Sequence, residues 1–312
     1  MLTCSRNEGV RVIRIGVDFG GTKIEAAALD RDGQFLARVR QPNPGEYDTA
    51  IRTVIALVAE AEQKVGARAE RIGMGMPGSI SPVTGEVRNS NSTYLNGKPF
   101  DKDLAKALGR PVRVANDANC FALSEAVDGA GKDADCVFGV IIGTGCGGGV
   151  VVHNHALDGK NFIAGEWGHT PLPWLEPDEY RSQKCWCGRW DCLERYVAGS
   201  AFVNHYKAAG GEAKDGAEIV ARARAGEDMA AHELDRYINR LGRGLAMICD
   251  ILDPDVIVLG GGMSNTDELY GERLRKAVEG PIFSDQFITP ILRAAHGDSS
   301  GVRGAAWLWP WD

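Results

Sequence analysis

The chain has 312 residues, of which 44% are hydrophobic and 25% charged, and its formal net charge is −7. At about 150 residues to a domain, this length predicts two globular domains or one large one. The negative charge argues against nucleic acid or an anionic membrane surface as partner. Glycine is the outlier, because its 40 residues gather in short clusters beside apolar runs, which indicates loops with special backbone requirements.

Nothing in the sequence indicates export or membrane insertion. The start, MLTCSRNEGVRV, has no apolar stretch of the signal-peptide type. The most apolar stretch, residues 136–152, is interrupted by glycines, which argues against a spanning helix. Eight cysteines are few for a secreted disulfide framework of this size, and three of them lie within eight positions, which favours a metal site in a reducing compartment. We therefore expect a cytoplasmic protein.

The first half of the chain is predicted to alternate strands and helices. Short apolar runs rich in β-branched residues predict strands at 10–17, 24–29, 34–41, 71–76 and 111–115. The first two strands are joined by a Gly-Gly-Thr turn, which predicts a hairpin. Helices are expected at 48–64, at 101–108 with an Asp cap at Asp101, and at 118–127.

The second half opens with a similar pattern. We expect a strand at 137–142, a glycine turn at 143–149, a returning strand at 150–153 and then an Asp-Gly turn. Residues 15–33 follow the same order, which indicates a degenerate internal duplication. Later, a long helix ending at Leu252 and a buried strand at 256–259 are predicted. Two similar halves of strands and helices predict an α/β fold with two domains around a cleft.

Two glycine-rich turns are candidates for phosphate binding. The G-x-G-x-x-G matches at 73–78 and 143–148 lack the following helix that a dinucleotide site needs, and no P-loop motif occurs. Each strand–turn–strand loop can point backbone N–H groups at an anion, and Asp18 can hold hydrated Mg²⁺. One such loop alone is more simply a hairpin turn with positive φ, but two of them favour a nucleotide clamp. The residues are Gly20, Gly21, Thr22, Lys23, Gly143, Thr144, Gly145, Cys146 and Gly147.

Asp117 stands where the strand at 111–115 turns into a helix. A carboxylate at the end of such a strand is suited to act as a general base. Asp is equally common as the N-cap of a helix. The residue types and their order leave these two interpretations equally supported.

A cysteine cluster indicates a metal site. Cys185, Cys187 and Cys192 with one histidine would form a closed Cys₃His set, which is typical of structural zinc. His169 is nearest, and His155 or His205 are also within reach. Cysteines without metal remain an alternative. Two tryptophans of this loop, Trp186 and Trp190, would flank a ligand or cover the zinc, and covering is preferred.

These motifs together resemble the ROK family of sugar kinases and repressors. The resemblance rests on DFGGTK, Asn116-Asp117, IGTGCGGG, GEWGH, CWCGRWDCLE and DPDVIVLGGGMSN, and it runs in register from about residue 12 to the end. Within the family, PGSISPVTGEVRNSNSTYLNGKPFDKDL and HGDSSGVRGAAWLWP are most similar to bacterial fructokinases that also accept mannose.

The resemblance implies an actin-like (ribonuclease H-like) duplicated fold with two domains around an ATP and sugar cleft. The domains would be residues 10–117 and residues 118–297, with a zinc knuckle at 169–192. The C-terminal helix, at about 298–312, would pack back on the first domain through its tryptophans.

The resemblance also implies roles for single residues. It makes Asp117 the general base and His169 the fourth zinc ligand. It places Gly261 and Gly262 against the nucleoside. The sugar contacts it implies are Gly78, Asn116, Asp117, Glu166, His169 and Glu194, with Ser79 and Asn91 as further candidates. One residue departs from the pattern: Asp191 stands where the family usually has glycine, and we expect the turn to survive because Asp tolerates left-handed backbone.

The implied activity is ATP-dependent phosphorylation of fructose at O6, with mannose as a further substrate and with Mg²⁺ and structural Zn²⁺. An N-acetylglucosamine or glucose kinase of the same family is the alternative. A sugar-responsive repressor is disfavoured, because only 17 residues precede Asp18 and the charge is negative. A catalytically silent actin-like scaffold is disfavoured by the presence of Asp117 and both glycine turns. We expect no nucleic acid or membrane partner, and a homodimer.

Overall fold

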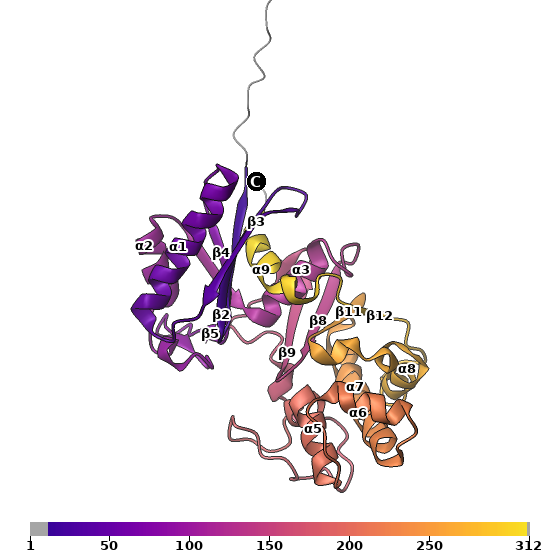
Figure 1. Ribbon diagram of the computed structural model, residues 1–312. Coiled ribbons are helices and arrows are strands. Elements are labelled where there is room, and N and C mark those ends of the chain that lie inside the picture. The colour runs from indigo at the N-terminus through magenta and orange to yellow at the C-terminus, as the bar shows by residue number, and fades with distance from the viewer. Residues whose placement is uncertain (1–11, 311–312) are drawn as a thin grey trace, which may run out of the picture. The chain divides into compact units, whose positions relative to one another are not determined.

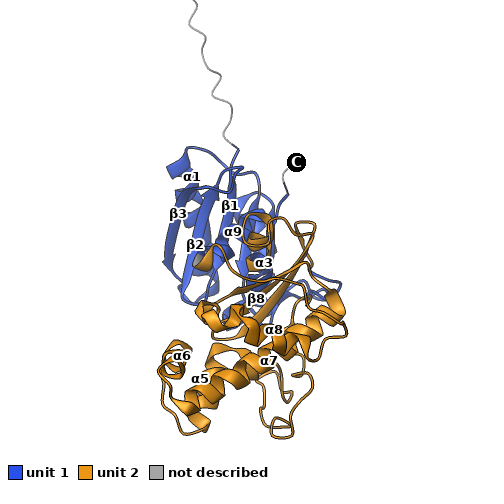
Figure 2. Cartoon of the chain, turned by 90° about the vertical axis from the view of Figure 1, so that its right-hand side faces the viewer, with its two compact units in different colours: residues 1–120, 158–162, 299–312 blue, residues 121–157, 163–298 orange. Residues whose placement is uncertain are grey.

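The structure, a computed structural model, describes residues 12–310. This part of the chain forms two compact units (Figure 2). Unit 1 contains the described residues up to 120 together with 158–162 and 299–310, and unit 2 contains residues 121–157 and 163–298. No helix within residues 12–310 is both long and apolar enough to cross a lipid bilayer.

Unit 1 is built on a five-stranded mixed sheet with the order β3-β2-β1-β4-β7. Its strands are β1 (Arg14–Phe19), β2 (Lys23–Leu29), β3 (Phe35–Pro42), β4 (Ile72–Met76) and β7 (Val112–Asn116). Three of these strands, β2, β3 and β4, are labelled in Figure 1. The first three strands pair antiparallel as successive hairpins, whereas β4 and β7 continue the sheet parallel to β1. A short ribbon of β5 (Ser79–Ile80) and β6 (Val87–Arg88) follows β4.

Two helices and a short turn complete one side of unit 1. In α1 (Tyr47–Val65) the apolar residues recur at helical spacing, and Ala50, Val54, Leu57, Val58 and Ala61 are buried. This helix ends at Gly66, which adopts the left-handed conformation typical of a C-terminal glycine. Next to α1 lies α2 (Phe100–Leu108), preceded by a 3₁₀ turn, η1 (Thr93–Leu95).

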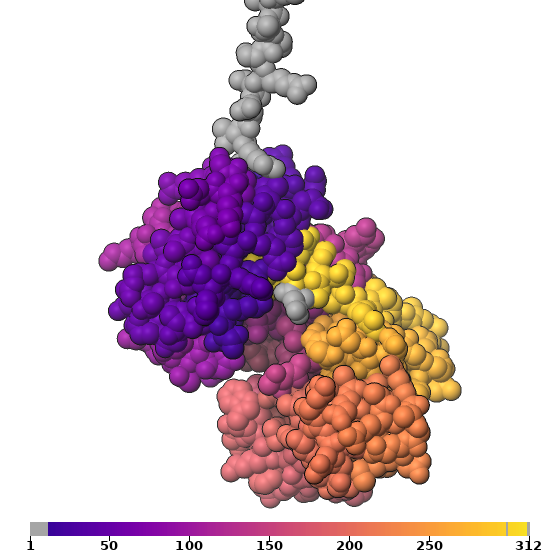
Figure 3. Space-filling view, viewed as in Figure 1, coloured from indigo at the N-terminus to yellow at the C-terminus, as the bar shows by residue number. Residues whose placement is uncertain are grey.

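The C-terminal helix α9 (Ser300–Trp307) packs against β1 and β4 of unit 1 at backbone distance. A Cβ added at Gly16 would lie 2.0 Å from the carbonyl oxygen of Val302, and one at Gly73 would lie 1.7 Å from that of Ala305. Glycine is therefore required at both strand positions. The space-filling view shows yellow C-terminal residues against the indigo residues of unit 1 (Figure 3).

Unit 2 contains a second five-stranded sheet with the order β10-β9-β8-β11-β12. Its strands are β8 (Cys136–Ile142), β9 (Cys146–Val152), β10 (His155–Ala156), β11 (Val256–Gly260) and β12 (Ile291–Arg293). Its helices are α4 (Glu194–Val197), α5 (Gly199–Ala208), α6 (Gly216–Arg224), α7 (Asp228–Leu252) and α8 (Glu272–Glu279). Four 3₁₀ turns, η2 (Trp167–His169), η3 (Gly262–Asn265), η4 (Asp267–Tyr270) and η5 (Gly297–Ser299), join elements of the second half of the chain.

The two sheets have the same topology, which confirms the internal duplication. In each sheet, the first strand along the chain (β1 or β8) pairs antiparallel with the second (β2 or β9) and parallel with the fourth (β4 or β11). The packing against the sheets is repeated as well, because α3 (Asp117–Val127) approaches β8 and β11 at two glycines. A Cβ at Gly139 would lie 2.6 Å from Ala122 Cβ, and one at Gly260 would lie 2.4 Å from the ring of Phe121.

Three predicted boundaries differ from the structure. Asp101 does not cap α2, which begins at Phe100 because this ring is buried against Phe19 at 5.1 Å between centroids. The strand expected at 150–153 begins at Cys146 and ends at Val152, so three glycines lie inside β9. Positions 10 and 11 of the first predicted strand, and 311 and 312 of the C-terminal helix, lie outside the described residues.

Candidate active site and metal centre

The carboxyl ends of the parallel strands of unit 1 bring four predicted site residues to one edge of the sheet. Asp18 in β1 is paired with Gly75 in β4, and Asn116 in β7 is paired with Met76. Asp117 follows immediately as the first residue of α3. Gly78, just past β4, accepts a hydrogen bond from Asn116 Nδ2 at 3.3 Å. In open α/β sheets this edge is the usual place for ligand binding.

Asn116 and Asp117 both accept the first free N–H of α3, that of Ala118. The Asn116 Oδ1 accepts the N–H of Ala118 at 2.8 Å, two residues further on, as an N-cap side chain does. The same N–H also lies 2.8 Å from Asp117 Oδ1. Among residues 12–310, no hydrogen bond occupies Oδ2 of Asp117. This oxygen is therefore available to accept a proton.

Both carboxyl groups at this edge bind protons more tightly than usual. Burial raises the pKa of Asp18 to about 6, and the charges of Asp117 and Glu25 raise it further, against an opposing effect of Lys23. The Asp117 side chain is accessible to solvent, yet the protein around it raises its pKa by desolvation, while the Ala118 N–H opposes that shift. Two like charges in one place favour a bound cation.

The first glycine turn connects β1 and β2 without left-handed backbone. The N–H of Gly20 donates to the carbonyl of Lys23 at 2.9 Å, and the side chain of Asn43 donates to the Gly20 carbonyl at 2.7 Å. Neither Gly20 nor Gly21 has φ in the left-handed range, and a Cβ at Gly21 would meet nothing within 4 Å. The interpretation of a hairpin turn that needs positive φ therefore does not apply to this turn.

The second glycine turn lines a pocket of about 500 Å³ in unit 2. The pocket residues are Gly143, Thr144, Gly199, Ser200, Val203, Lys214, Asp215, Gly216, Ala217, Gly262 and Met263. The start of α5 fixes the turn, because the N–H of Gly199 donates to the Gly143 carbonyl at 2.7 Å and Ser200 Oγ donates to the Thr144 carbonyl at 2.6 Å. A Cβ at Gly143 or Gly262 would meet nothing within 4 Å, so the space beside both is open.

Glycines inside β9 allow the segment that carries Glu166 and His169 to lie directly on the sheet. A Cβ at Gly148 would lie 2.7 Å from the Gly165 carbonyl, and one at Gly168 would lie 2.3 Å from that of Cys146. The buried Trp167 locks the segment there, because its Nε1 donates to the Gly147 carbonyl at 3.1 Å. This close packing explains why β9 begins within the glycine run.

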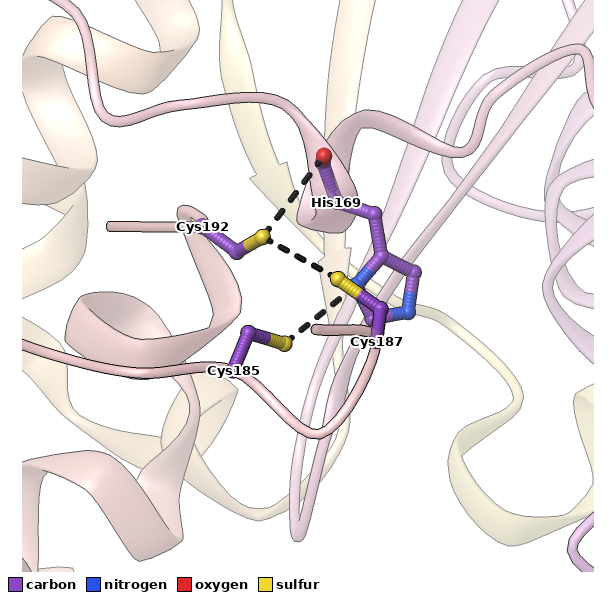
Figure 4. A group of neighbouring side chains, drawn as sticks. All are labelled: His169, Cys185, Cys187 and Cys192. Carbon is purple, nitrogen blue, oxygen red and sulfur yellow. Dashed lines mark hydrogen bonds between the residues drawn. The ribbon is translucent and has the colours of Figure 1, made fainter. Parts of the chain in front are cut away.

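His169, Cys185, Cys187 and Cys192 form a metal-binding geometry (Figure 4). Their ligand atoms all lie within 4.8 Å of one another. Sγ of Cys187 is 3.5 Å from Sγ of Cys192, and Sγ of Cys185 is 3.7 Å from Nδ1 of His169. Bonds of roughly 2.0–2.3 Å at tetrahedral angles place ligand atoms roughly 3.5–3.8 Å apart, so the donor set fits Zn²⁺.

Asp191 keeps the knuckle turn closed although it stands where glycine is usual. Its φ is 59°, in the left-handed range. Its carboxylate accepts the N–H of Arg181 at 2.6 Å and that of Gln183 at 3.0 Å, and the Tyr196 hydroxyl lies 2.9 Å away. These hydrogen bonds compensate for the backbone conformation.

Glu194, two residues after Cys192, lies between the knuckle and the second glycine turn. Its Oε2 accepts the N–H of Cys146 at 3.2 Å. Its Oε1 accepts the indole N–H of Trp186 at 2.9 Å. The Trp186 ring packs edge-on against His169, with 4.9 Å between centroids. The two predicted sugar contacts, Glu194 and His169, therefore share one neighbour.

Sequence comparison identifies the family. The sequence profile of the ROK family matches residues 14–311. The chain belongs to the ROK family. It is 39% identical over 298 residues to the N-acetyl-D-glucosamine kinase of Pectobacterium atrosepticum, which covers 94% of this chain and 97% of that protein.

Two crystal structures are similar to this ROK protein along nearly its whole length. The ROK hexokinase from Thermus thermophilus superposes with a TM-score of 0.84 at 32% identity, covering 95% of this chain and 97% of that one. The ROK family glucokinase from Streptomyces griseus, in complex with glucose and AMPPNP, gives a TM-score of 0.74 at 29% identity, covering 94% and 98%. These similarities confirm the actin-like, ribonuclease H-like duplicated α/β fold.

In this ROK protein the predicted site residues fall into three groups. Asp18, Gly78, Asn116 and Asp117 lie at one edge of unit 1. Gly143, Thr144 and Gly262 line the pocket of unit 2. The third group consists of His169 and the three cysteines of the knuckle, with Glu166 and Glu194 close to them in the sequence.

Other candidates do not line the pocket. Cys146 and Gly147 belong to β9, and Gly261, with φ 80°, is needed for close approach to β8. Ser79 accepts a hydrogen bond from Arg88 at 3.3 Å, and Asn91 is exposed.

The sequence did not predict that the starts of α5 and α6 line the pocket, or that Trp186 donates to Glu194. The starts of α5 and α6 line the pocket, and the Gly-Ser and Asp-Gly pairs at 199–200 and 215–216 were the only available indication. The hydrogen bond from Trp186 to Glu194 had no sequence pattern to reveal it.

Proposed function

We propose that this ROK protein is an ATP-dependent hexose kinase and that its first substrate is N-acetyl-D-glucosamine. The identity of 39% over nearly the full length of an N-acetyl-D-glucosamine kinase supports this substrate. This relative gives no support to fructose, which was the substrate expected from the sequence. It favours the alternative stated there, an N-acetylglucosamine kinase. The solved ROK hexokinase and the glucokinase bound to glucose and AMPPNP support phosphoryl transfer from ATP to a hexose.

The observation that carries the proposal is the free carboxylate oxygen of Asp117. In the proposed reaction Oδ2 of Asp117 accepts the proton of the sugar 6-hydroxyl. The sugar 6-oxygen bonds to the γ-phosphorus of ATP, and ADP leaves with the electrons of the broken P–O bond. The raised pKa of Asp117 makes the group a better base. The N–H of Ala118 contacts Oδ1 of Asp117 and is shared with Asn116, so this interaction leaves Oδ2 for the proposed role. The second N–H of Asn116 Nδ2 remains to orient a sugar hydroxyl.

Unit 2 supplies the remaining sugar contacts in this proposal. Carboxylates accept strong hydrogen bonds from hydroxyl groups, which suits Glu166 and Glu194 to a sugar. Nδ1 of His169 faces the thiols, so Nε2 is left to donate to the sugar (Figure 4). The closed donor set of the knuckle leaves no position for a substrate, so a zinc ion there would organise the loop and take no part in the reaction.

The glycine turns suit the triphosphate, because Gly21 and Gly143 of these turns, and Gly262 in the pocket, satisfy no internal packing requirement. Gly21, Gly143 and Gly262 have φ outside the left-handed range and no atom within 4 Å of an added Cβ. The remaining physical advantage of glycine is the close approach of a ligand to backbone N–H groups. Asp18 would hold Mg²⁺, which supplies positive charge to the phosphates when bound. The pocket of unit 2 is large enough for a nucleoside.

A coupled assay of ADP release over a panel of hexoses tests the proposal. With ATP and Mg²⁺, N-acetylglucosamine should give the highest kcat/KM, with glucose, mannose and fructose well below it. A higher kcat/KM for fructose would restore the substrate expected from the sequence. Absence of sugar-dependent ADP release from every member of the panel would refute the kinase assignment.

A further inference from the structure

Trp186 is an exposed aromatic residue with two defined contacts. It lies between the metal-binding residues Cys185 and Cys187, and 68% of its surface is accessible. Its ring meets His169 edge-on, at 85° and 4.9 Å between centroids, and its indole N–H donates to Glu194 Oε1 at 2.9 Å. A tryptophan that only covered a metal site would need the ring contact but not the hydrogen bond.

Glu194 is held at both of its oxygens. Oε2 accepts the backbone N–H of Cys146 at 3.2 Å, at the start of β9. A Cβ at Gly145 would lie 2.9 Å from the same oxygen, so glycine leaves room for the carboxylate. Without the contact from Trp186, this flexible side chain would be fixed at Oε2 alone. Each oxygen keeps a second lone pair for a ligand.

We propose that Trp186 is a positioning residue that holds Glu194 in the orientation needed to bind the sugar. The proposal rests on the proposed function, in which Glu194 accepts a sugar hydroxyl. It also links the metal to the sugar, because ligands on both sides of Trp186 fix its backbone and the indole N–H transmits that order to Glu194. Ordering a group before binding lowers the entropic cost of binding.

The test compares Trp186→Phe with the wild type and with Trp190→Phe. Phenylalanine retains an aromatic ring against His169 but has no N–H to donate. Trp190 belongs to the same loop, is 42% exposed and faces Arg181, so it controls for the loss of an indole there.

The expected result is a KM for the sugar about ten-fold higher in Trp186→Phe, with kcat within about two-fold of wild type. Trp190→Phe should match the wild type in both constants. The metal content should stay the same in all three proteins. Unchanged KM in Trp186→Phe would overturn the proposal, and so would loss of metal from this variant, because a merely covering role predicts that loss.

A second measurement separates this inference from the kinase assignment. In protein with ¹⁵N-labelled tryptophan, the indole resonance missing from Trp186→Phe belongs to Trp186. If this N–H is bound to Glu194, its resonance should shift in Glu194→Gln, while that of Trp190 should not. If the wild type phosphorylates no sugar, the proposed function fails. In that case, a shift of the Trp186 indole resonance in Glu194→Gln would still support the positioning of Glu194, and an unshifted resonance would overturn it.

Discussion

The two sheets share a scaffold but differ at the edge where the chemistry would occur. In unit 1 α9 packs on β1 and β4 at two glycines, and in unit 2 α3 packs on β8 and β11 in the same way. The ends of the first strands differ, because β1 ends with Asp18 and Phe19 whereas β8 ends with two isoleucines. The duplicated part is therefore the framework, and the turns carry the differences in chemistry.

The connection between the third and fourth strands along the chain also differs between the two units. In unit 1 the third and fourth strands along the chain are joined through α1 alone. In unit 2 the corresponding connection, from β10 to β11, contains the knuckle, Glu194 and the helices that line the pocket. Under the proposed function this gives a division of labour, in which unit 1 provides the base together with Asn116 and Asp18, and unit 2 provides the knuckle, Glu194 and the pocket.

The largest expected effect is at Asp117. Replacing it with asparagine should lower kcat about 10²- to 10⁴-fold, the usual contribution of a general base, with little change in sugar binding. Steady-state kinetics and calorimetric titration with sugar provide the two measurements. Asp32→Asn, in the exposed turn between β2 and β3, is the matched control in the same unit. A variant with wild-type turnover would remove Asp117 from the proposed mechanism.

Metal removal should weaken sugar binding and lower the stability of unit 2, and it should leave the position of the proposed base, Asp117 in unit 1, unchanged. We expect about one zinc per chain, and its removal by a chelator should raise the KM for sugar about ten-fold or more and lower Tm by several degrees. Elemental analysis, kinetics and a thermal melt check this, with zinc added back as the control. Purified active protein without metal would contradict the assignment of the knuckle.

The raised pKa of Asp18 predicts a stability effect that depends on pH. Because the folded pKa, about 6, lies above the ordinary value of 3.8, the folded state holds this proton more tightly than the unfolded state does. Stability contributed by the protonated group is lost as pH rises through about 6. Asp18→Asn should therefore be about 1 to 3 kcal/mol more stable than wild type at about pH 7.5, and about equal at about pH 4.

Urea unfolding at both pH values measures the effect. The same variant should bind Mg²⁺–nucleotide more weakly, because the carboxylate is lost. A stabilisation of the same size at both pH values would contradict the titration of Asp18 as its cause.

The smallest effect is expected at Asp191. Replacement with glycine relieves the backbone but leaves the N–H groups of Arg181 and Gln183 without the carboxylate, which should cost about 1 to 2 kcal/mol. Zinc transfer to a colorimetric chelator should become faster. Asp191→Asn keeps one oxygen acceptor, so its stability and its rate of zinc transfer should lie between those of the wild type and of Asp191→Gly. If glycine instead slows zinc release, the hydrogen bonds of Asp191 do not stabilise the knuckle.

The framework was predictable because its residues follow local patterns. The strand at 137–142 and the helix ending at Leu252 carry clear apolar periodicity, and the structure confirms both. The start of β9 was not predictable, because it depends on the close approach of a later segment, in which Gly165 packs against Gly148 and Gly168 against Cys146. The start of α2 was missed for a similar reason, since its tertiary contact with Phe19 decides it.

The site was predictable where a residue type implies its chemistry. The cysteine cluster stood out in the sequence, and the structure brings the four predicted metal ligands together. The residue type of Asp117 left the base and the helix cap equally supported, and its role as base stays a prediction. The walls of the pocket consist of helix starts with ordinary residues, and only the folded chain assembles them. Likewise, the hydrogen bond from Trp186 depends on a side-chain orientation that spacing does not determine.

The division of labour between the units is tested most directly by measuring kcat and KM of Asp117→Asn and Glu194→Gln in the same assay with N-acetylglucosamine. The account predicts that Asp117→Asn loses kcat with little change in KM, whereas Glu194→Gln raises KM with little change in kcat. It would be contradicted if Glu194→Gln lowered kcat as far as Asp117→Asn at an unchanged KM, or if Asp117→Asn turned over at the wild-type rate.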